Sequence, residues 1–77
     1  MVHAFIMIRT GAGTSQEVRR TIEDLESVEE CHVVAGEFDI IAEADGEEVY
    51  DVLSTSSADV QGVAGVEETK TYVSLSG

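Results

Sequence analysis

The sequence predicts an α+β fold of the ferredoxin-like type, in which two helices cover one face of a four-stranded antiparallel sheet. Apolar runs and helical periodicities alternate along the chain in the order βαββαβ. The segments Val28–Glu30 and Val66–Glu68 both read Val-Glu-Glu and lead into the second and fourth strands, as expected of two related halves. A length of 77 residues suits one core, so we expect residues 1–77 to form a single domain.

The first strand and the first helix follow from apolar patterning. Residues 2–9 (VHAFIMIR) are apolar almost throughout, as in a strand buried on both faces. Thr14 and Glu17 match a capping box, in which a hydroxyl and a carboxylate satisfy free amides at a helix start. Apolar residues then recur at helical spacing and predict an amphipathic helix over residues 15–26.

A hairpin comes next. Residues 30–35 (ECHVVA) and 38–44 (FDIIAEA) predict the second and third strands, which are joined through Gly36 and Glu37. A tight hairpin turn needs a residue with positive φ, and we expect Gly36 to supply it.

The remaining chain predicts a second helix and a last strand. The acid-rich residues 45–48 resemble a helix start, and we expect the helix to end in the polar run STSS, residues 54–57. Residues 67–75 (EETKTYVSL) have the Thr, Tyr and Val typical of a strand. The expected buried stripe of the helix is Val49, Val52 and Leu53.

Right-handed crossovers place the first and third strands in the centre of the sheet, in the order 4-1-3-2. The helices cover one face only, yet both faces carry apolar side chains, because Phe5 and Met7 point away from Ile6 and Ile41 points away from Ile40. An uncovered apolar sheet face is an association surface. We therefore expect a dimer packed sheet to sheet, with further assembly through the edge strands.

The chain is strongly acidic, with 16 Asp and Glu against 4 Lys and Arg and a net charge of −12. Such a surface repels phosphate backbones and argues against direct nucleic-acid binding. An organism with a salty cytoplasm and an ordinary acidic protein both fit this composition. The apolar run at the start is too short to span a bilayer and follows no basic region, so we expect a cytoplasmic protein that does not bind membranes.

No arrangement of side chains predicts catalysis. Cys31 has no cationic neighbour in sequence that would lower its pKa, so a small buried hydrophobe is expected. His3 and His32 lack metal-ligand spacing, and the TGAGTS segment at residues 10–15 lacks the Lys of a phosphate-binding loop. We therefore expect no catalytic residue, no cofactor and no metal.

Asp39 is the residue that the strand pattern explains least. An acid inside a strand, on the face expected to be an interface, needs an amide, a hydroxyl or a bound ammonium group as its partner. Gly36 nearby would let a ligand approach free backbone amides, which bind a carboxylate. Together the two features suit a zwitterion, and a carboxylate that is merely capped is the alternative.

Two motifs connect the chain with a known family. The first is V-x-G-x-(Y/F)-D, and the second is G-V-x-x-T-x-T. They are matched by Val34, Gly36, Phe38 and Asp39, and by Gly65, Val66, Thr69 and Thr71. In these motifs and in its element order, essentially the whole chain resembles the ligand-binding domain of the Lrp/AsnC transcription regulators, which is also called the RAM domain.

The resemblance implies dimers formed through the sheet, rings of dimers, and small amino acids bound between dimers near the hairpin. Hairpin amides would contact the effector carboxylate, Asp39 its ammonium group, and two threonine hydroxyls would assist. Ordinary β-propensity explains the threonines equally well. The residues expected to bind the effector are Gly36, Glu37, Phe38, Asp39, Thr69 and Thr71.

Full-length members of the family carry an N-terminal helix-turn-helix, whereas the first strand here begins at residue 2. We therefore expect a stand-alone effector-binding and oligomerisation module that acts indirectly in transcription regulation or amino-acid metabolism. Three arrangements fit the missing part: assembly with full-length Lrp/AsnC regulators, a domain that senses an amino acid by itself, and a piece of a longer protein. The start at Met1 favours the stand-alone domain.

One alternative is a small dimeric α+β-barrel enzyme, such as a cofactor-free monooxygenase or an isomerase. His3 and His32, both expected on strands, are poor candidates for the active-site residues of such an enzyme. Another alternative is a purely structural assembly partner.

Overall fold

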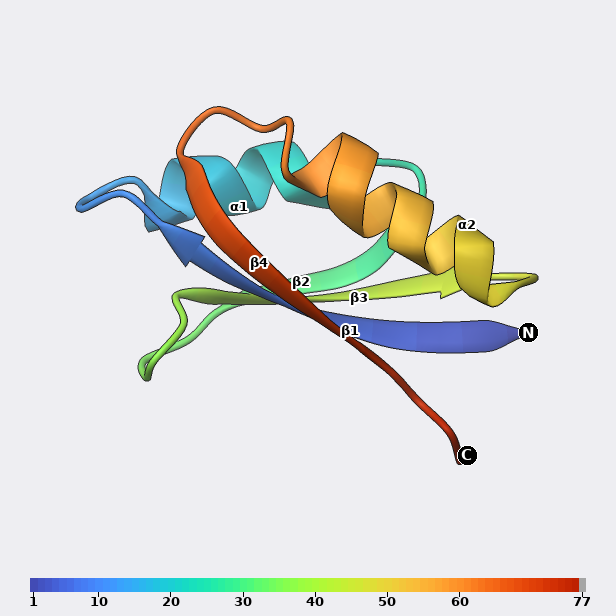
Figure 1. Ribbon diagram of the computed structural model, residues 1–77. Helices are drawn as coiled ribbons and strands as arrows, with labels where there is room; N and C mark the ends of the chain where they lie inside the picture. Colours follow the sequence, from blue (N-terminus) through green and yellow to red (C-terminus); the bar gives the residue numbers. More distant parts are fainter. Residues whose placement is uncertain (77) are drawn as a thin grey trace.

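The sheet has the strand order β2-β3-β1-β4, and all neighbouring strands are antiparallel. The computed structural model describes residues 1–76, and Figure 1 shows the helices lying on one face of the sheet. The elements are β1 (Val2–Thr10), α1 (Ser15–Glu23), β2 (Val28–Val33), β3 (Ile40–Gly46), α2 (Val49–Ser54), the π-helical segment η1 (Thr55–Val60) and β4 (Val66–Val73). The expected ferredoxin-like fold and strand order are confirmed. Within residues 1–76, no helix is long and apolar enough to cross a membrane.

The core lies between the sheet and the helices. Alternate residues of the two central strands are fully buried, as the period of a strand requires. Side chains from α1, α2 and η1 close this layer from the other side. The fully buried apolar residues are Ala4, Ile6 and Ile8 of β1, Ile40, Ala42 and Ala44 of β3, and Val18, Ile22, Val52 and Val60 of the helices.

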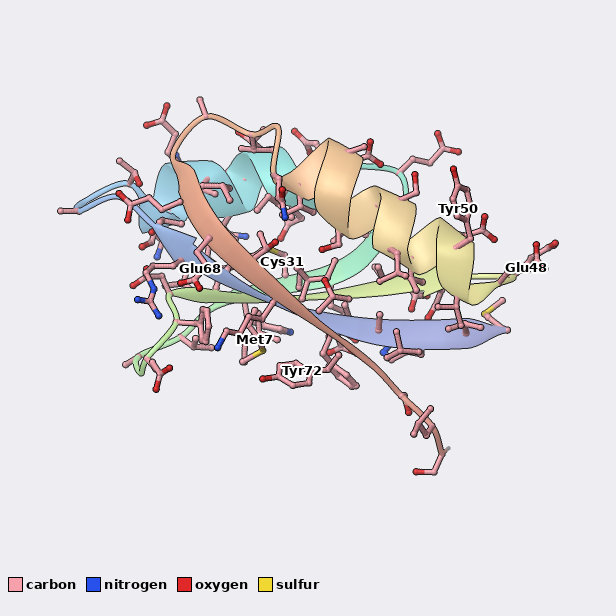
Figure 2. All side chains as sticks on the ribbon, in the orientation of Figure 1. Met7, Cys31, Glu48, Tyr50, Glu68 and Tyr72 are labelled. Carbon is pink, nitrogen blue, oxygen red and sulfur yellow. The ribbon has the colours of Figure 1, made fainter. Side chains whose placement is uncertain are left out.

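The opposite face of the sheet, which we call the open face, has no cover among the described residues. Phe5 of β1 lies opposite Tyr72 of β4, and 38% and 57% of their respective surfaces are exposed. Figure 2 shows Met7 and Tyr72 on the side of the sheet away from the helices. The open apolar face is thus confirmed, and the dimer expected to cover it stays a prediction.

The first helix begins at Ser15 as expected, but its end and its N-terminal capping differ from expectation. It ends at Glu23 instead of residue 26, with Asp24 as its C-cap. The predicted capping box is absent, because the Thr14 hydroxyl donates to the carbonyl oxygen of Gly11 (2.7 Å) and makes no cap hydrogen bond. That hydroxyl stabilises the preceding turn instead of the helix start.

The α-helix α2 ends at Ser54, the first residue of the polar run, as expected, but the chain remains helical beyond it. It continues through η1, where the buried Thr55 donates its hydroxyl proton to the Asp51 carbonyl oxygen (3.1 Å). A polar side chain bonded in this way can be buried at little cost. Of the predicted stripe only Val52 is buried, since Val49 and Leu53 are about half exposed.

Strand boundaries shift by about two residues. We expected strands at 30–35, 38–44 and 67–75, whereas β2, β3 and β4 lie at 28–33, 40–46 and 66–73. The predicted tight turn is therefore a longer loop over residues 34–39. Such a loop closes without a left-handed residue, and the expectation of a positive φ at Gly36 is wrong.

The positive φ angles belong to Gly13 (77°) and Gly65 (98°). A Cβ at Gly65 would also lie 2.7 Å from Cγ2 of the buried Val18. We predict that Gly65→Ala lowers the free energy of unfolding by about 1–3 kcal/mol, through backbone strain and overpacking. Urea unfolding followed by circular dichroism measures this change.

Gly36→Ala is the matched control. No neighbouring atom lies within 4 Å of its Cβ position, and its φ is not positive. Its free energy of unfolding should stay within about 0.5 kcal/mol of the parent value. Equal losses in the two variants would contradict this account of the two glycines.

Candidate functional site

Asp39 anchors the hairpin loop of residues 34–39 to the end of β1. Its backbone N–H donates to the Ile8 carbonyl oxygen (2.9 Å), and its carbonyl oxygen accepts from the Val34 N–H (2.8 Å). Its carboxylate Oδ2 accepts a hydrogen bond from the Thr10 N–H (2.8 Å). Asp39 thus immediately precedes β3, which begins at Ile40, instead of lying within it, so the predicted strand bound is wrong. An amide, one of the three partners considered, satisfies one carboxylate oxygen.

The loop presents backbone amides to solvent. Ala35, Gly36 and Glu37 are exposed, and their N–H groups donate to no other group within residues 1–76. Gly36 has open space where a side chain would begin. A small anionic group can therefore approach the backbone here, as the sequence predicted for Gly36.

Positive charge gathers beside this loop. The Arg9 guanidinium carbon lies 5.0 Å from the centre of the buried Phe38 ring, and the Lys70 Nζ lies 5.8 Å from it. These are two of the four Lys and Arg residues in a chain of net charge −12. Arg9 Nε is buried and 3.5 Å from Glu68 Oε1, and it makes no hydrogen bond with a described residue. Phe38 thus gathers cationic groups that attract a carboxylate.

The two predicted threonines lie elsewhere. Thr69 and Thr71 of β4 pair with Ile8 and Ile6 of β1 and share their helix-covered face. Thr69 Oγ1 accepts a hydrogen bond from the Gln61 side chain (2.8 Å), and the Thr71 hydroxyl is bonded to the Ser56 hydroxyl. No hydrogen bond among the described residues joins either threonine to the hairpin loop. The six predicted residues thus form two groups, and the threonine hydroxyls connect β4 with the segment after α2.

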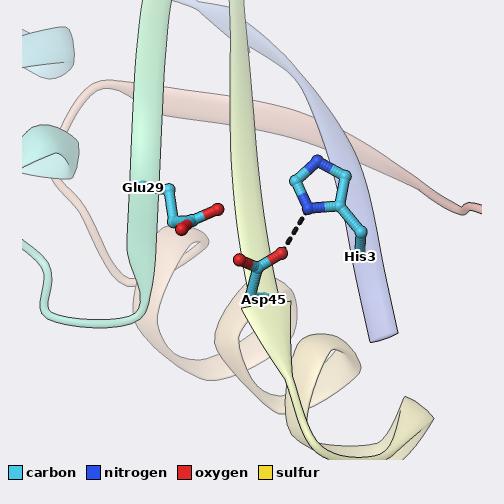
Figure 3. Close-up of side chains that lie close together, drawn as sticks. All are labelled: His3, Glu29 and Asp45. Carbon is cyan, nitrogen blue, oxygen red and sulfur yellow. Dashed lines mark hydrogen bonds and ion pairs between the residues drawn. The ribbon is translucent and has the colours of Figure 1, made fainter. Parts of the chain in front are cut away.

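A second polar group lies on the open face. His3 of β1 is bonded through Nδ1 to Asp45 and through Nε2 to Glu43 Oε1 (2.8 Å). Hydrogen bonds to Asp45 and Glu43 raise the pKa of His3. The pKa of Asp45 is lowered by hydrogen bonds from Glu29 and His3, and that of Glu29 is raised by its hydrogen bond to Asp45. Figure 3 shows the Glu29 carboxylate beside Asp45.

Reasoning from the sequence missed this group because its members come from three strands. The signal that could have found it is the register of β1 and β3, which pairs His3 with Asp45. Glu29 could not have been placed, because it was expected to precede the strand.

Cys31 is no candidate nucleophile. Its side chain belongs to the core cluster and is 7% exposed. Burial raises the pKa of the thiol to about 11. The prediction that it is a small buried hydrophobe is confirmed.

The fold, the open face and the anchored loop define a small α+β domain of the ferredoxin-like class. Comparison with protein-family models matches residues 3–77 to one family, described as the Lrp/AsnC ligand binding domain. The chain belongs to this family, and the resemblance deduced from the two motifs is confirmed.

Individual relatives agree with this assignment. The leucine-responsive regulatory protein of Haemophilus influenzae is 33% identical over 70 residues, which cover 87% of this chain and 40% of that protein. The chain thus spans less than half of this curated relative. The crystal structure of TTHA0845 from Thermus thermophilus matches with a TM-score of 0.92 and 26% identity, over 100% of this chain and 96% of that one.

A third relative shares the fold at lower identity. The transcriptional regulator NMB0573 from Neisseria meningitidis, solved as a complex with L-Met, has a TM-score of 0.83 and 18% identity. The match covers 97% of this chain and 50% of that one. The family is one of transcriptional regulators and not of enzymes.

The buried thiol gives a direct test. At pH 8 we expect Cys31 to react with a disulfide reagent about a hundredfold more slowly in the folded protein than in denaturant, because its pKa is raised from 9.0 to about 11. Absorbance of the released thiolate follows the reaction. Equal rates in the two conditions would contradict the buried position.

Proposed function

We propose that this domain binds a small amino acid at the hairpin loop, and that binding controls its self-association. Through this it acts indirectly in transcription regulation or amino-acid metabolism. Family membership supports the proposal, as do the names of two relatives, one leucine-responsive and one solved with L-Met.

The observation that carries the proposal is the pairing of free amides with nearby cations. The exposed N–H groups of Gly36 and Glu37 are suited to hold an α-carboxylate, which Arg9 and Lys70 beside Phe38 would attract. The free amides and the two cations favour an anionic group at this position, on a surface that is otherwise mostly negative.

Asp39 would provide the complementary half of a zwitterion site. Its Oδ2 accepts from the Thr10 amide, and its Oδ1 makes no hydrogen bond within residues 1–76. That oxygen is free to accept from the ammonium group of an amino acid, which would form a charge-assisted hydrogen bond. Thr69 and Thr71 would contact the amino acid only if their hydrogen bonds to Gln61 and Ser56 were broken.

A second copy of the chain is the proposed cover of the open face. Phe5 and Tyr72 lie side by side there, and burying exposed aromatic surface favours association. Arg9 and Lys70 lie on the same face and also contact Phe38 of the loop. A ligand that draws these two side chains toward the loop would therefore move charged groups at the edge of the proposed dimer interface.

The proposed partner in regulation is a full-length Lrp/AsnC regulator instead of nucleic acid. A net charge of −12 makes direct contact with a phosphate backbone unfavourable. The other candidate, a purely structural assembly partner, would form the same dimers without responding to an amino acid.

Titration calorimetry against the twenty amino acids, in high salt to screen self-repulsion, tests the proposal. We predict millimolar or tighter binding of at least one small amino acid. Asp39→Ala should weaken that binding at least tenfold, because charge-assisted hydrogen bonds contribute about 1.5–3 kcal/mol. Circular dichroism checks that the variant remains folded.

Asp59→Ala is the matched control, since it removes the same charge from an exposed position in η1. It should bind as the parent does. Equal loss of amino-acid affinity in the two variants would mean that the change in net charge alone causes the effect. Binding of none of the amino acids, together with dimers in sedimentation, would refute the effector role in favour of the structural one.

A further inference from the structure

Three potential metal ligands meet on the open face, away from the hairpin loop. His3 belongs to β1, Asp45 to β3 and Glu29 to β2. Their ligand atoms all lie within 4.8 Å of one another. Figure 3 shows the Asp45 carboxylate between the Glu29 carboxylate and the His3 imidazole. A cation bound here would require the hydrogen bond between His3 and Asp45 to open and the Glu29 carboxylate to move closer.

The sheet itself builds this arrangement. His3 and Asp45 are directly paired in the β1–β3 register, so their side chains lie on the same face. The register of β2 against β3 shifts between Val28 and Glu30, which leaves Glu29 unpaired. A β-bulge of this kind re-aims the side chain of its extra residue, and here it directs a carboxylate toward Asp45.

The imidazole is oriented as in known metal centres. Its Nε2 bonds to Glu43 Oε1 at 2.8 Å, while Nδ1 faces Asp45. Metal-binding histidines usually donate the outer ring N–H to a carboxylate in this way, which fixes the tautomer and leaves the other nitrogen for the metal. Glu43 would be that supporting carboxylate. The side chains of His3 and Asp45 are 31% and 23% exposed, whereas Glu29 is exposed, so the position is shielded on the side of His3 and Asp45 only.

We propose that His3, Glu29 and Asp45 bind a divalent transition-metal cation of the Zn²⁺ class. One imidazole and two carboxylates favour such a cation over Mg²⁺ or Ca²⁺, which prefer oxygen ligands alone. The cation would replace the hydrogen-bonded proton at His3 Nδ1 and relieve the repulsion between the two carboxylates. This inference does not depend on amino-acid binding at the loop.

A neighbouring group offers a built-in comparison. Glu30, His32 and Glu43 also have ligand atoms within 4.8 Å of one another. The side chains of His32 and Glu30 are 57% and 59% exposed, and Glu43 is already bonded to His3. The chain has only two histidines, and both lie on this part of the open face. The better-oriented and less exposed His3 group is the site we assign.

Calorimetric titration of the untagged protein with Zn²⁺ at neutral pH tests the assignment. Zn²⁺ is the probe because Cu²⁺ and Ni²⁺ can bind a histidine near a free amino terminus without any carboxylate. We expect one Zn²⁺ per chain at micromolar concentration, not displaced by millimolar Mg²⁺. His3→Gln and Glu29→Gln should each weaken binding by about tenfold to a hundredfold, and Glu43→Gln by about tenfold.

His32→Gln and Glu30→Gln are the matched controls, because they make the same chemical changes in the neighbouring group of ligands. Both should retain the parent affinity, and circular dichroism confirms that each variant is folded. Equal losses of Zn²⁺ affinity in Glu29→Gln and Glu30→Gln would mean that surface charge alone causes the effect, and would refute the proposed site. Loss in His32→Gln alone, or no binding at tens of micromolar Zn²⁺, would overturn it as well.

Discussion

The whole molecule depends on one constraint: two short helices can cover only one face of a four-stranded sheet. The core is therefore built from alternate residues of β1 and β3, with Ile6 and Ile40 among those fully buried. The residues between them have to face the other way. This places Phe5 and Tyr72 on a surface that no described residue covers, and it leaves the domain dependent on association for further burial.

The hairpin loop is connected with that surface. Asp39 fixes the loop to the end of β1 through the Thr10 amide, so the loop keeps a defined position without regular structure. Phe38 then brings Arg9 and Lys70 of the open face to the same place. The structural role of Asp39 is compatible with the proposed ligand-binding role, because only one of its carboxylate oxygens accepts a hydrogen bond within residues 1–76. Under the proposed function, this loop would couple ligand binding to the dimer interface.

The sequence predicted the element order, the strand order and the family, because periodicity and motifs are local. It failed where a tertiary contact decides. Gly36 needed no positive φ because the loop is longer than a tight turn, and the polar run after α2 stayed helical because Thr55 is satisfied by a backbone carbonyl. The grouping of His3 with Glu29 depends on strand register and a bulge, neither of which single-sequence patterns define.

The central claim is that an amino acid binds at the hairpin loop. Amide chemical-shift mapping by NMR, with the amino acid that calorimetry identifies, tests it most directly. The account predicts the largest shifts at Gly36, Glu37 and Thr10, with smaller ones at Arg9 and Lys70. Shifts confined to the helix-covered residues Thr69 and Thr71, with none in the loop, would contradict it.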